Sequence, residues 1–544
     1  MSPSEAEKKA EEEKVAKVEK AGELLFCGGT SWDTLGRSKS AVEGNLVSPT
    51  RLRSLMGVDI RFVASGSTSC HCVALDVEGR CYTWGRNERG QLGHGDTVQR
   101  DMPTIVSELS KYNIVRAGAG RAHTVVVTED GNSFSFGWNK HGQLGSGSVK
   151  GEIELSPVRC LVSDVSTAVC GGDFTVWLSS VEGSSILTAG LPQYGQLGHG
   201  TDNEYNTKEG SVRLAYEAQP RPKAVASLAG KTIVNAACGT NHTVAVDSKG
   251  FVYTWGFGGY GRLGHREQKD EWSPRAIDVF QRNNILTPNA VISAGSANSA
   301  CTAAGGQLYM WGKIKSTGDD CMYPKPLMGL SGWNIRCMDS GSTHNFCGAD
   351  ESCISWGHSQ HGELGYGPVG PKSSANPKKV DLLEGMHVLG VACGLAHSLI
   401  LVDRTKVGDR IDQLEVYDGK APDESSIKDA NAVPESKGPP AKKTQNKKTS
   451  AKNSKRKEVD DSEDSEDEEN DSEVSEEENG NMEGKGKRGG KVSGRGRGRS
   501  AKKPSAEEVF SPKRGRGRPP SSEKNPQTGQ VREKTGKRGR PSKS

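Results

Sequence analysis

Residues 238–264 read CGTNHTVAVDSKGFVYTWGFGGYGRLG, and this stretch decides the fold. It opens with Cys-Gly-x-x-His, continues with the apolar run Thr243 to Val246, and turns at Asp247-Ser248-Lys249-Gly250. It then runs through the aromatic-rich segment Phe251 to Trp255 into a Gly, and a Leu-Gly pair follows. Apolar and aromatic runs joined by an Asp/Gly turn predict a β-hairpin.

The same signals recur along the whole first part of the chain. An aromatic residue just before a Gly marks six repeats and a small residue marks the seventh, at Phe26-Cys27-Gly28, Trp84-Gly85, Phe136-Gly137, Ala189-Gly190, Trp255-Gly256, Trp311-Gly312 and Trp356-Gly357. The Leu-Gly pair follows in Gln91-Leu92-Gly93, Gln143-Leu144-Gly145, Gln196-Leu197-Gly198, Arg262-Leu263-Gly264 and Glu363-Leu364-Gly365, with a degenerate first copy at Thr34-Leu35-Gly36. Each repeat has room for about four short strands.

A four-stranded unit cannot bury its own faces, whereas radial stacking covers the faces and leaves only short edges. Seven repeats therefore predict an all-β fold, a seven-bladed β-propeller over residues 23–403. The chain enters at Glu23 with the last part of a repeat, and Val391 to Asp403 form the first part of one. The two partial repeats together complete a seventh blade, which predicts that the first and last strands pair and close the ring. An open solenoid would need polar caps instead.

The ends of the chain differ in composition from the repeats. Residues 1–22 are a charged extension, and we expect residues 404–544 to be disordered because they are polar and lack apolar periodicity. The net charge of +4 conceals two blocks: Asp460 to Glu478 carries thirteen acidic residues and no basic one, and Lys485 to Ser544 carries twenty Lys or Arg against four Glu. Separated charge blocks are typical of interaction tails.

Two stretches of the basic end contain Arg-Gly-Arg-Pro and resemble AT-hooks. Gly lets an extended backbone lie on the floor of a narrow minor groove, and the flanking Arg side chains run along that groove. The predicted DNA-binding residues are Arg514, Arg516, Gly517, Arg518, Pro519, Arg538, Gly539, Arg540 and Pro541. The alternative is a low-complexity cationic tail that binds any polyanion, including RNA. Both interpretations predict nucleic acid as a partner.

The tail also carries predicted signals for transport and regulation. A bipartite basic cluster predicts a nuclear localisation signal at Lys442, Lys443, Lys455, Arg456 and Lys457. Ser511, followed by Pro and basic residues, is a predicted phosphorylation site, and so are Ser465 and Ser475, each with Glu three residues on. A phosphate on Ser511 would bring negative charge next to the first Arg-Gly-Arg-Pro stretch.

The residue pattern favours no catalytic or metal chemistry. The His and Cys of the repeats occur one at a time, without CxxC or HxxxH spacing, and are predicted to be packed core residues. In Cys70-His71-Cys72 the alternation along a strand separates His71 from the two thiols, which makes a poor chelate. We therefore expect no metal, no cofactor and no enzyme active site. With no apolar leader and no run near the roughly 20 residues that span a bilayer, the chain is predicted to be intracellular with free thiols.

These repeats resemble those of the regulator of chromosome condensation family, over about residues 23–403. Longer strings are similar to its second branch, of the telophase-disc type: WGRNERGQLGHGD (Trp84 to Asp96), WGFGGYGRLGH (Trp255 to His265), Met322-Tyr323-Pro324-Lys325 and GELGYG (Gly362 to Gly367). The resemblance implies a seven-bladed propeller, nucleotide exchange on the nuclear GTPase Ran, and nucleosome binding, as in the founding member. For the second branch it implies mitotic chromosomes and small GTPases including Rac.

Two features of the family map onto this chain. The Gly171-Gly172-Asp173-Phe174 turn matches the family's Gly-x-Asp turn, so the resemblance assigns Asp173 to GTPase contact. It also places a protruding β-wedge at residues 146–156, SGSVKGEIELS, whose predicted contact residues are Ser146, Lys150, Glu152, Glu154 and Ser156. The sequence of this segment departs from the family's wedge, and Phe174 replaces the usual His. The alternative for both features is an ordinary surface loop with an N-capping Asp.

Besides the segment at residues 146–156, a second insertion at Gly200 to Lys231 lengthens the connection within one predicted blade. It is predicted to be either a partner contact or a flexible spacer. Together these signals predict a monomeric, chromatin-associated nuclear regulator with a role in mitosis or chromosome organisation. Its propeller binds a small GTPase of the Ran or Rac class as an exchange factor, and nucleosomal histones, while its tail binds AT-rich DNA. The alternative is a chromatin or histone-binding adaptor without exchange activity.

Overall fold

A computed structural model describes residues 21–37, 44–181, 185–208, 214–315, 318–405 and 407–419. These ranges consist of β-strands joined by turns and by short 3-10 helices. Within them a single α-helix occurs, α2, which covers only Gly408–Ile411. The described part of the chain is therefore all-β, as the repeats predict.

Seven sheets, here called blades 1 to 7, contain the strands in the order given, from the innermost strand outward. Blade 1 holds β3 (Ile60–Ala64), β4 (His71–Asp76), β5 (Cys81–Gly85) and β6 (Arg100–Ile105), and blade 2 holds β7 (Ile114–Ala119), β8 (His123–Thr128), β9 (Ser133–Trp138) and β10 (Ile153–Arg159). Blade 3 holds β11 (Val165–Cys170), β12 (Phe174–Ser179), β13 (Ile186–Gly190) and β16 (Gln219–Ala224), and blade 4 holds β17 (Ile233–Cys238), β18 (His242–Asp247), β19 (Val252–Gly256) and β20 (Glu271–Ala276).

The remaining blades follow the same order. Blade 5 holds β21 (Ile292–Ala294), β22 (Asn298–Thr302), β23 (Leu308–Gly312) and β24 (Cys321–Pro326), and blade 6 holds β25 (Ile335–Ser340), β26 (His344–Ala349), β27 (Ser352–Gly357) and β28 (Ser374–Lys379). Blade 7 holds β29 (Val388–Cys393), β30 (His397–Val402), β1 (Glu23–Gly28), β2 (Leu46–Leu52) and β31 (Val416–Tyr417). The 3-10 helices are η1 (Arg53–Leu55), η2 (Ser107–Leu109), η3 (Ala226–Leu228), η4 (Gly259–Gly261), η5 (Arg282–Asn284), η6 (Ala304–Gly306), η7 (Met328–Leu330) and η8 (Asp381–Leu383).

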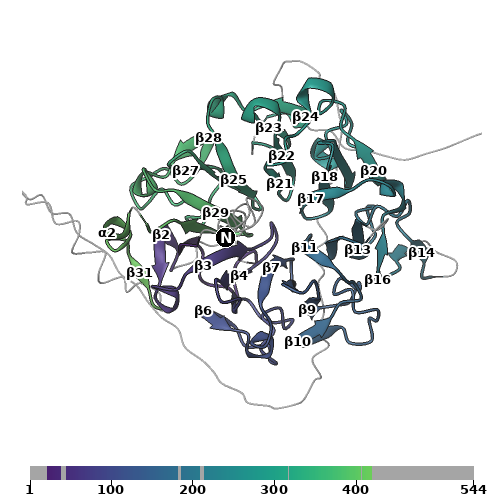
Figure 1. Cartoon of the computed structure of the whole chain (residues 1–544), viewed down its shortest axis with the longest axis horizontal. Helices are drawn as coiled ribbons and strands as arrows, with labels where there is room; N and C mark the ends of the chain where they lie inside the picture. The colour runs from purple at the N-terminus through teal and green to yellow at the C-terminus, as the bar shows by residue number, and fades with distance from the viewer. Residues whose placement is uncertain are drawn as a thin grey trace, which may run out of the picture. The chain divides into compact units, whose positions relative to one another are not determined.

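The seven blades are arranged around a common centre, with the first strand of each blade nearest to it (Figure 1). Neighbouring blades pack face to face, and the aromatic residues of the repeats fill the space between them. Trp84, Trp255, Trp311 and Trp356 are all almost fully buried there. The prediction of a seven-bladed all-β propeller is confirmed.

Blade 7 is built from both ends of the described chain. Strand β1 pairs antiparallel with β30, from Glu23 opposite Val402 to Gly28 opposite His397, and with β2 on its other side. All six residues of β1 are buried, since the strand lies inside the sheet rather than at an edge. The sequence repeat is thus offset from the structural blade by two strands.

The described chain does not end at Asp403, where the sequence placed the end of the propeller. It continues through α2 to β31, which adds a parallel fifth strand to the outer edge of blade 7. Ile411 and Tyr417 are buried against the blade. Arg51, itself buried, joins the two ends of the described chain because it pairs with Glu23 at 2.7 Å and with Asp412 at 2.8 Å.

Buried histidines link neighbouring blades. The Thr124 hydroxyl donates its proton to the Gln91 carbonyl at 2.8 Å, so it accepts a hydrogen bond from Nε2–H of His71, 2.7 Å away. The same side-chain pairing to the next blade recurs as His123–Thr175, His242–Ser299 and His344–Ser398. In blade 7 the corresponding residue of the next blade is Cys72, whose Sγ is 3.1 Å from Nε2 of His397, and the Ser65 hydroxyl lies 3.0 Å from the same nitrogen. These histidines therefore have a structural role, which agrees with the prediction that the repeat histidines are packed core residues.

All thirteen cysteines are free, as the sequence predicts. In the described ranges no group of three or more His, Cys, Asp or Glu is placed to hold a metal ion. No helix among the described residues is long and apolar enough to cross a membrane.

Candidate functional site

Asp173 lies in the inner turn of blade 3, between β11 and β12. Its carboxylate Oδ2 is 3.3 Å from Nη2 of Arg121, which comes from the corresponding turn of blade 2 and has a side chain 49% exposed. The other oxygen, Oδ1, is buried and has no hydrogen-bond partner among the described residues. A buried carboxylate oxygen without a donor costs free energy. The turn therefore holds a carboxylate oxygen whose hydrogen-bonding capacity is not satisfied within the described residues.

The backbone fixes the position of this turn. The N–H of Arg121 donates to the Gly172 carbonyl at 3.0 Å, and the N–H of Gly172 donates to the Thr240 carbonyl of blade 4 at 2.8 Å. A Cβ at Gly172 would lie 3.0 Å from that Thr240 oxygen, so the glycine allows the close approach. Asp173 is thus held by bonds to the blades on both sides.

The blades can be compared with one another at this position. The residues corresponding to Asp173 are Cys70, Ala122, Asn241, Ala297, Thr343 and Ala396, so the acid occurs in blade 3 alone. Blade 3 also has Phe174 in the position of the histidine of five other blades. Arg121 was not identified from the sequence, although it stands where the other inner turns have small, hydroxyl or apolar residues; aligning these turns would have found it.

His123, which lies next to this site, does not supply a positive charge to the Asp173 carboxylate. Burial lowers the pKa of His123 to about 4, and the charge of Asp173 only partly opposes that shift. The imidazole is therefore neutral at neutral pH, and its Nε2–H donates to the Thr175 hydroxyl at 3.0 Å. Arg121 is the cation that faces Asp173.

Residues 146–156 do not form the predicted protruding wedge. Ile153 to Ser156 belong to β10, the outermost strand of blade 2, where Glu154 lies opposite Gly137 of β9. Residues 146–152 form the loop before that strand, and the N–H of Gly147 donates to the Pro220 carbonyl at 2.9 Å. The alternating composition that suggested a separate hairpin is that of a blade's fourth strand.

The structure does not bring this segment together with Asp173. Asp173 lies at the inner end of its blade, and Ile153 to Ser156 lie in the outermost strand of the neighbouring blade. Three strand spacings separate inner and outer strands, which is roughly 14 Å. Ser156 instead donates to Glu108 at 2.7 Å.

A projecting hairpin occurs in the second insertion instead. Strands β14 (Glu204–Asn206) and β15 (Leu214–Tyr216) pair with each other outside the blades, with Glu204 opposite Tyr216. Tyr205 and Leu214 are about half exposed on it. The insertion then returns to blade 3 as β16. The described part of the insertion therefore contains a paired hairpin followed by the fourth strand of blade 3.

The predicted tail sites lie outside the described residues. This applies to the nuclear localisation cluster at Lys442, Lys443, Lys455, Arg456 and Lys457, to Ser465, Ser475 and Ser511, and to both Arg-Gly-Arg-Pro stretches.

The fold and its repeats define a propeller built from regulator of chromosome condensation repeats. The family model described as "Regulator of chromosome condensation (RCC1) repeat" matches residues 78–127, 130–178, 185–246, 249–302 and 350–401, and a second model of that description matches 60–91 and 114–143. Each match of the first model begins near the third strand of one blade and ends near the second strand of the following blade. The match at 350–401 runs in this way from blade 6 into blade 7. The chain belongs to the regulator of chromosome condensation family.

Named relatives match most of this chain. Protein RCC2 of Homo sapiens is 38% identical over 403 residues, which cover 70% of this chain and 76% of that protein. The protein RCC2 homolog of Danio rerio is 36% identical and covers 73% of this chain and 84% of its own length. The crystal structure of Prp20p from Saccharomyces cerevisiae has a TM-score of 0.57 at 20% identity, covers 73% of this chain and 96% of that one, and shares the fold.

Proposed function

We propose that this protein is a chromatin-associated nuclear regulator whose propeller binds a small GTPase of the Ran or Rac class and nucleosomal histones. Membership of the family supports this function, and the Prp20p structure is described together with that protein's binding properties to Gsp1p and histones. The observation that carries the GTPase part is the carboxylate of Asp173, of which one oxygen lacks a donor. The proposal assumes a closed ring, which we infer from the pairing of β1 with β30.

The chemistry of the turn suits a cationic group of the GTPase. Because Oδ1 is buried, a Lys or Arg side chain of the GTPase would reach it only if the half-exposed Arg121 side chain moves, and it would then complete the hydrogen bonding of the carboxylate. In the exchange reaction this contact would hold the GTPase in its nucleotide-free state. The hairpin β14–β15, inserted between the third and fourth strands of blade 3 with Tyr205 and Leu214 exposed, would offer a separate contact surface for a partner.

The tail completes the proposal. The two Arg-Gly-Arg-Pro stretches would hold the molecule on AT-rich DNA, and the basic cluster around Lys455 would direct it to the nucleus. The second candidate function is a chromatin adaptor that binds histones without exchange activity. The replacement of the usual His by Phe174 favours that alternative, because it changes the turn on which exchange would depend.

Nucleotide release from Ran and from Rac, each loaded with a fluorescent nucleotide, tests the proposal. We expect the protein to accelerate nucleotide release from one of the two GTPases. We expect Asp173→Ala to weaken binding of the nucleotide-free GTPase roughly ten- to a hundredfold, which is the change in affinity that corresponds to losing one hydrogen bond to a charged group. Alanine occupies the corresponding position in blades 2, 5 and 7, so the variant should fold.

Asp101→Ala, which removes an exposed carboxylate from the outermost strand of blade 1, is the matched control and should bind as the native protein does. If neither GTPase binds in the nucleotide-free form, or if Asp173→Ala binds normally, the adaptor function stands.

A further inference from the structure

Five blades share one hydrogen bond to the following blade. The residue two positions after the Leu-Gly pair donates its N–H to the fourth strand of the next blade: Gly95 to Leu155 at 2.9 Å, Gly147 to Pro220 at 2.9 Å, Gly200 to Trp272 at 2.8 Å, Arg266 to Met322 at 2.8 Å, and Gly367 to Val47 at 2.9 Å. All five donors have left-handed backbone, with φ values of 81°, 88°, 81°, 69° and 79° in the same order.

Arg266 is the exception among these five residues. Glycine adopts positive φ without steric penalty, whereas a residue with a Cβ is strained there. The backbone bond to Met322 is the same as in the other blades, so the fold itself gives no reason for an arginine. Strained backbone of this kind is concentrated at sites where the side chain is used.

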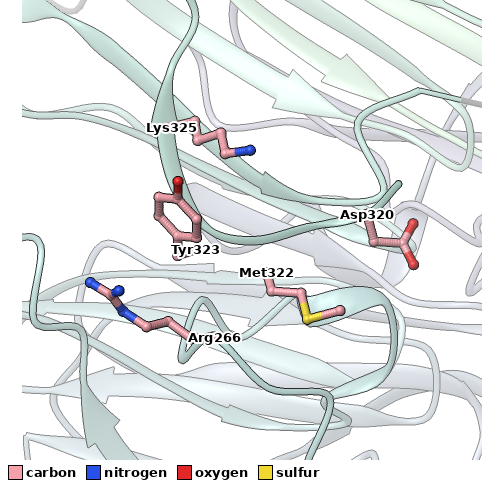
Figure 2. Close-up of a pocket in the computed structure, with 5 residues that line it drawn as sticks. All are labelled: Arg266, Asp320, Met322, Tyr323 and Lys325. Atoms are coloured by element: carbon pink, nitrogen blue, oxygen red, sulfur yellow. The ribbon is translucent and has the colours of Figure 1, made fainter. Parts of the chain in front are cut away.

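The Arg266 side chain lies at an open cavity of about 340 Å³, lined also by Asp320, Met322, Tyr323 and Lys325 (Figure 2). Tyr323, which is 40% exposed, lies between the two cationic side chains in this view. The Arg266 guanidinium is 5.4 Å and the Lys325 ammonium 5.1 Å from the centre of its ring. Tyr323 and Lys325 are two residues apart on β24, so their side chains leave the same face of the strand.

This arrangement holds two positive charges in place at a concave surface. Cation–π contacts with one ring restrict both side chains, so less conformational entropy is lost when an anion binds. A guanidinium donates two parallel hydrogen bonds to a phosphate, and an ammonium adds a third donor. The chemistry of the cavity is that of a site for a phosphoryl group.

The charge of Asp320 indicates which kind of phosphorylated molecule fits the cavity. Its carboxylate lies on the same cavity and would repel a continuous run of phosphates, as in a nucleic acid strand. It would instead attract a basic side chain close to a single phosphate. Met322 and Tyr323 offer apolar surface to the intervening chain.

We propose that this cavity between blades 4 and 5 binds a phosphorylated serine or threonine of a partner polypeptide that carries a basic residue nearby. Arg266 and Lys325 bind the phosphate, Tyr323 positions them, and Asp320 selects the basic neighbour. The proposal does not depend on GTPase binding, because it uses other blades and other residues than the Asp173 turn.

Fluorescence anisotropy with the full chain tests this site. The probe is a labelled mixture of nine-residue peptides with a central phosphoserine and a Lys or Arg at one of the two neighbouring positions; the comparison probes are its unphosphorylated counterpart and a single-stranded DNA oligomer. We expect Arg266→Gly to weaken phosphopeptide binding roughly ten- to a hundredfold. Its thermal midpoint should stay the same or rise, because four other blades have glycine at this position.

Arg282→Gly is the matched control, since Arg282 also has left-handed backbone (φ 54°) and does not line the cavity. It should bind the phosphopeptides as the native protein does, and Lys325→Met should lose affinity as Arg266→Gly does. Contributions of the basic tail are common to all these proteins and cancel in the comparison. The proposal fails if phosphorylation does not change the affinity, if Arg266→Gly binds normally, or if that variant loses only DNA.

Discussion

At the scale of single residues, the buried histidines make the folded propeller sensitive to acid. Burial lowers the pKa of His71 to about 3, of His123 to about 4 and of His397 to about 3. A histidine in the unfolded chain has a pKa of about 6.5, so the unfolded state binds protons first and stability falls as the pH drops below about 6.5. At pH 5 each of these histidines lowers the free energy of unfolding by about 2 kcal/mol.

Asp339 acts in the opposite direction. Burial raises its pKa to about 7, so its contribution to stability grows as the pH falls, and it offsets about one histidine. We expect the urea midpoint to fall steadily between pH 6.5 and pH 5. His123→Asn, which copies Asn298 of blade 5, should reduce the proton uptake on unfolding by about one. A midpoint that is flat over this range would contradict the assignment of neutral, buried imidazoles.

The internal repeats also show what the sequence could reveal about single residues. Singly recurring His and Cys predicted core positions rather than a metal site; the structure buries the five repeat histidines and all the cysteines except Cys238 and Cys337, which are partly buried. Asp173 was found through family resemblance, whereas Arg121 and Arg266 were missed because each conforms to no motif. Both are visible only as departures from the other repeats, and the cost of Arg266 becomes apparent only once its backbone angle is known.

At the scale of elements, strand β1 decides the integrity of blade 7. It lies between β30 and β2, so removing Glu23 to Gly28 divides that sheet into two separate pairs. It also removes Leu24, Leu25 and Phe26 from the core and leaves the buried Arg51 without Glu23. We expect this deletion to abolish the single cooperative unfolding transition in calorimetry. Deleting residues 1–20 is the control and should leave the transition unchanged; identical melting of the two proteins would mean that the ring does not need this strand.

Elements were predicted well wherever the repeat was regular. The all-β class, the seven repeats of about four strands each, and the assignment of the first and last repeat segments to one blade follow from the recurrence of the aromatic-Gly, Leu-Gly and Cys-Gly-x-x-His signals. The two insertions were not predictable in this way, because a fourth strand and a projecting hairpin have the same alternating composition. Only the ladder partners separate them: Ile153 pairs with Trp138 of its own blade, whereas Glu204 pairs with Tyr216 within the insertion.

At the scale of the whole molecule, the basic end of the chain would supply most of the affinity for DNA. Residues 485–544 carry twenty Lys or Arg against four Glu and contain both Arg-Gly-Arg-Pro stretches. Each neutralised phosphate releases counterions, so the logarithm of affinity falls with the logarithm of salt concentration by about 0.9 per contact. With roughly six contacts, affinity should fall on the order of a thousandfold between about 50 and 200 mM salt.

Substitutions in the two stretches separate groove recognition from simple charge. Replacing Arg516, Arg518, Arg538 and Arg540 with Ala should reduce both the salt dependence and the preference for A·T over G·C in a competition assay. Replacing the same four residues with Lys keeps the charge but not the planar guanidinium that fits a narrow minor groove, so much of the salt dependence should remain while the preference disappears. A native tail that shows no A·T preference would leave the low-complexity cationic tail as the correct interpretation.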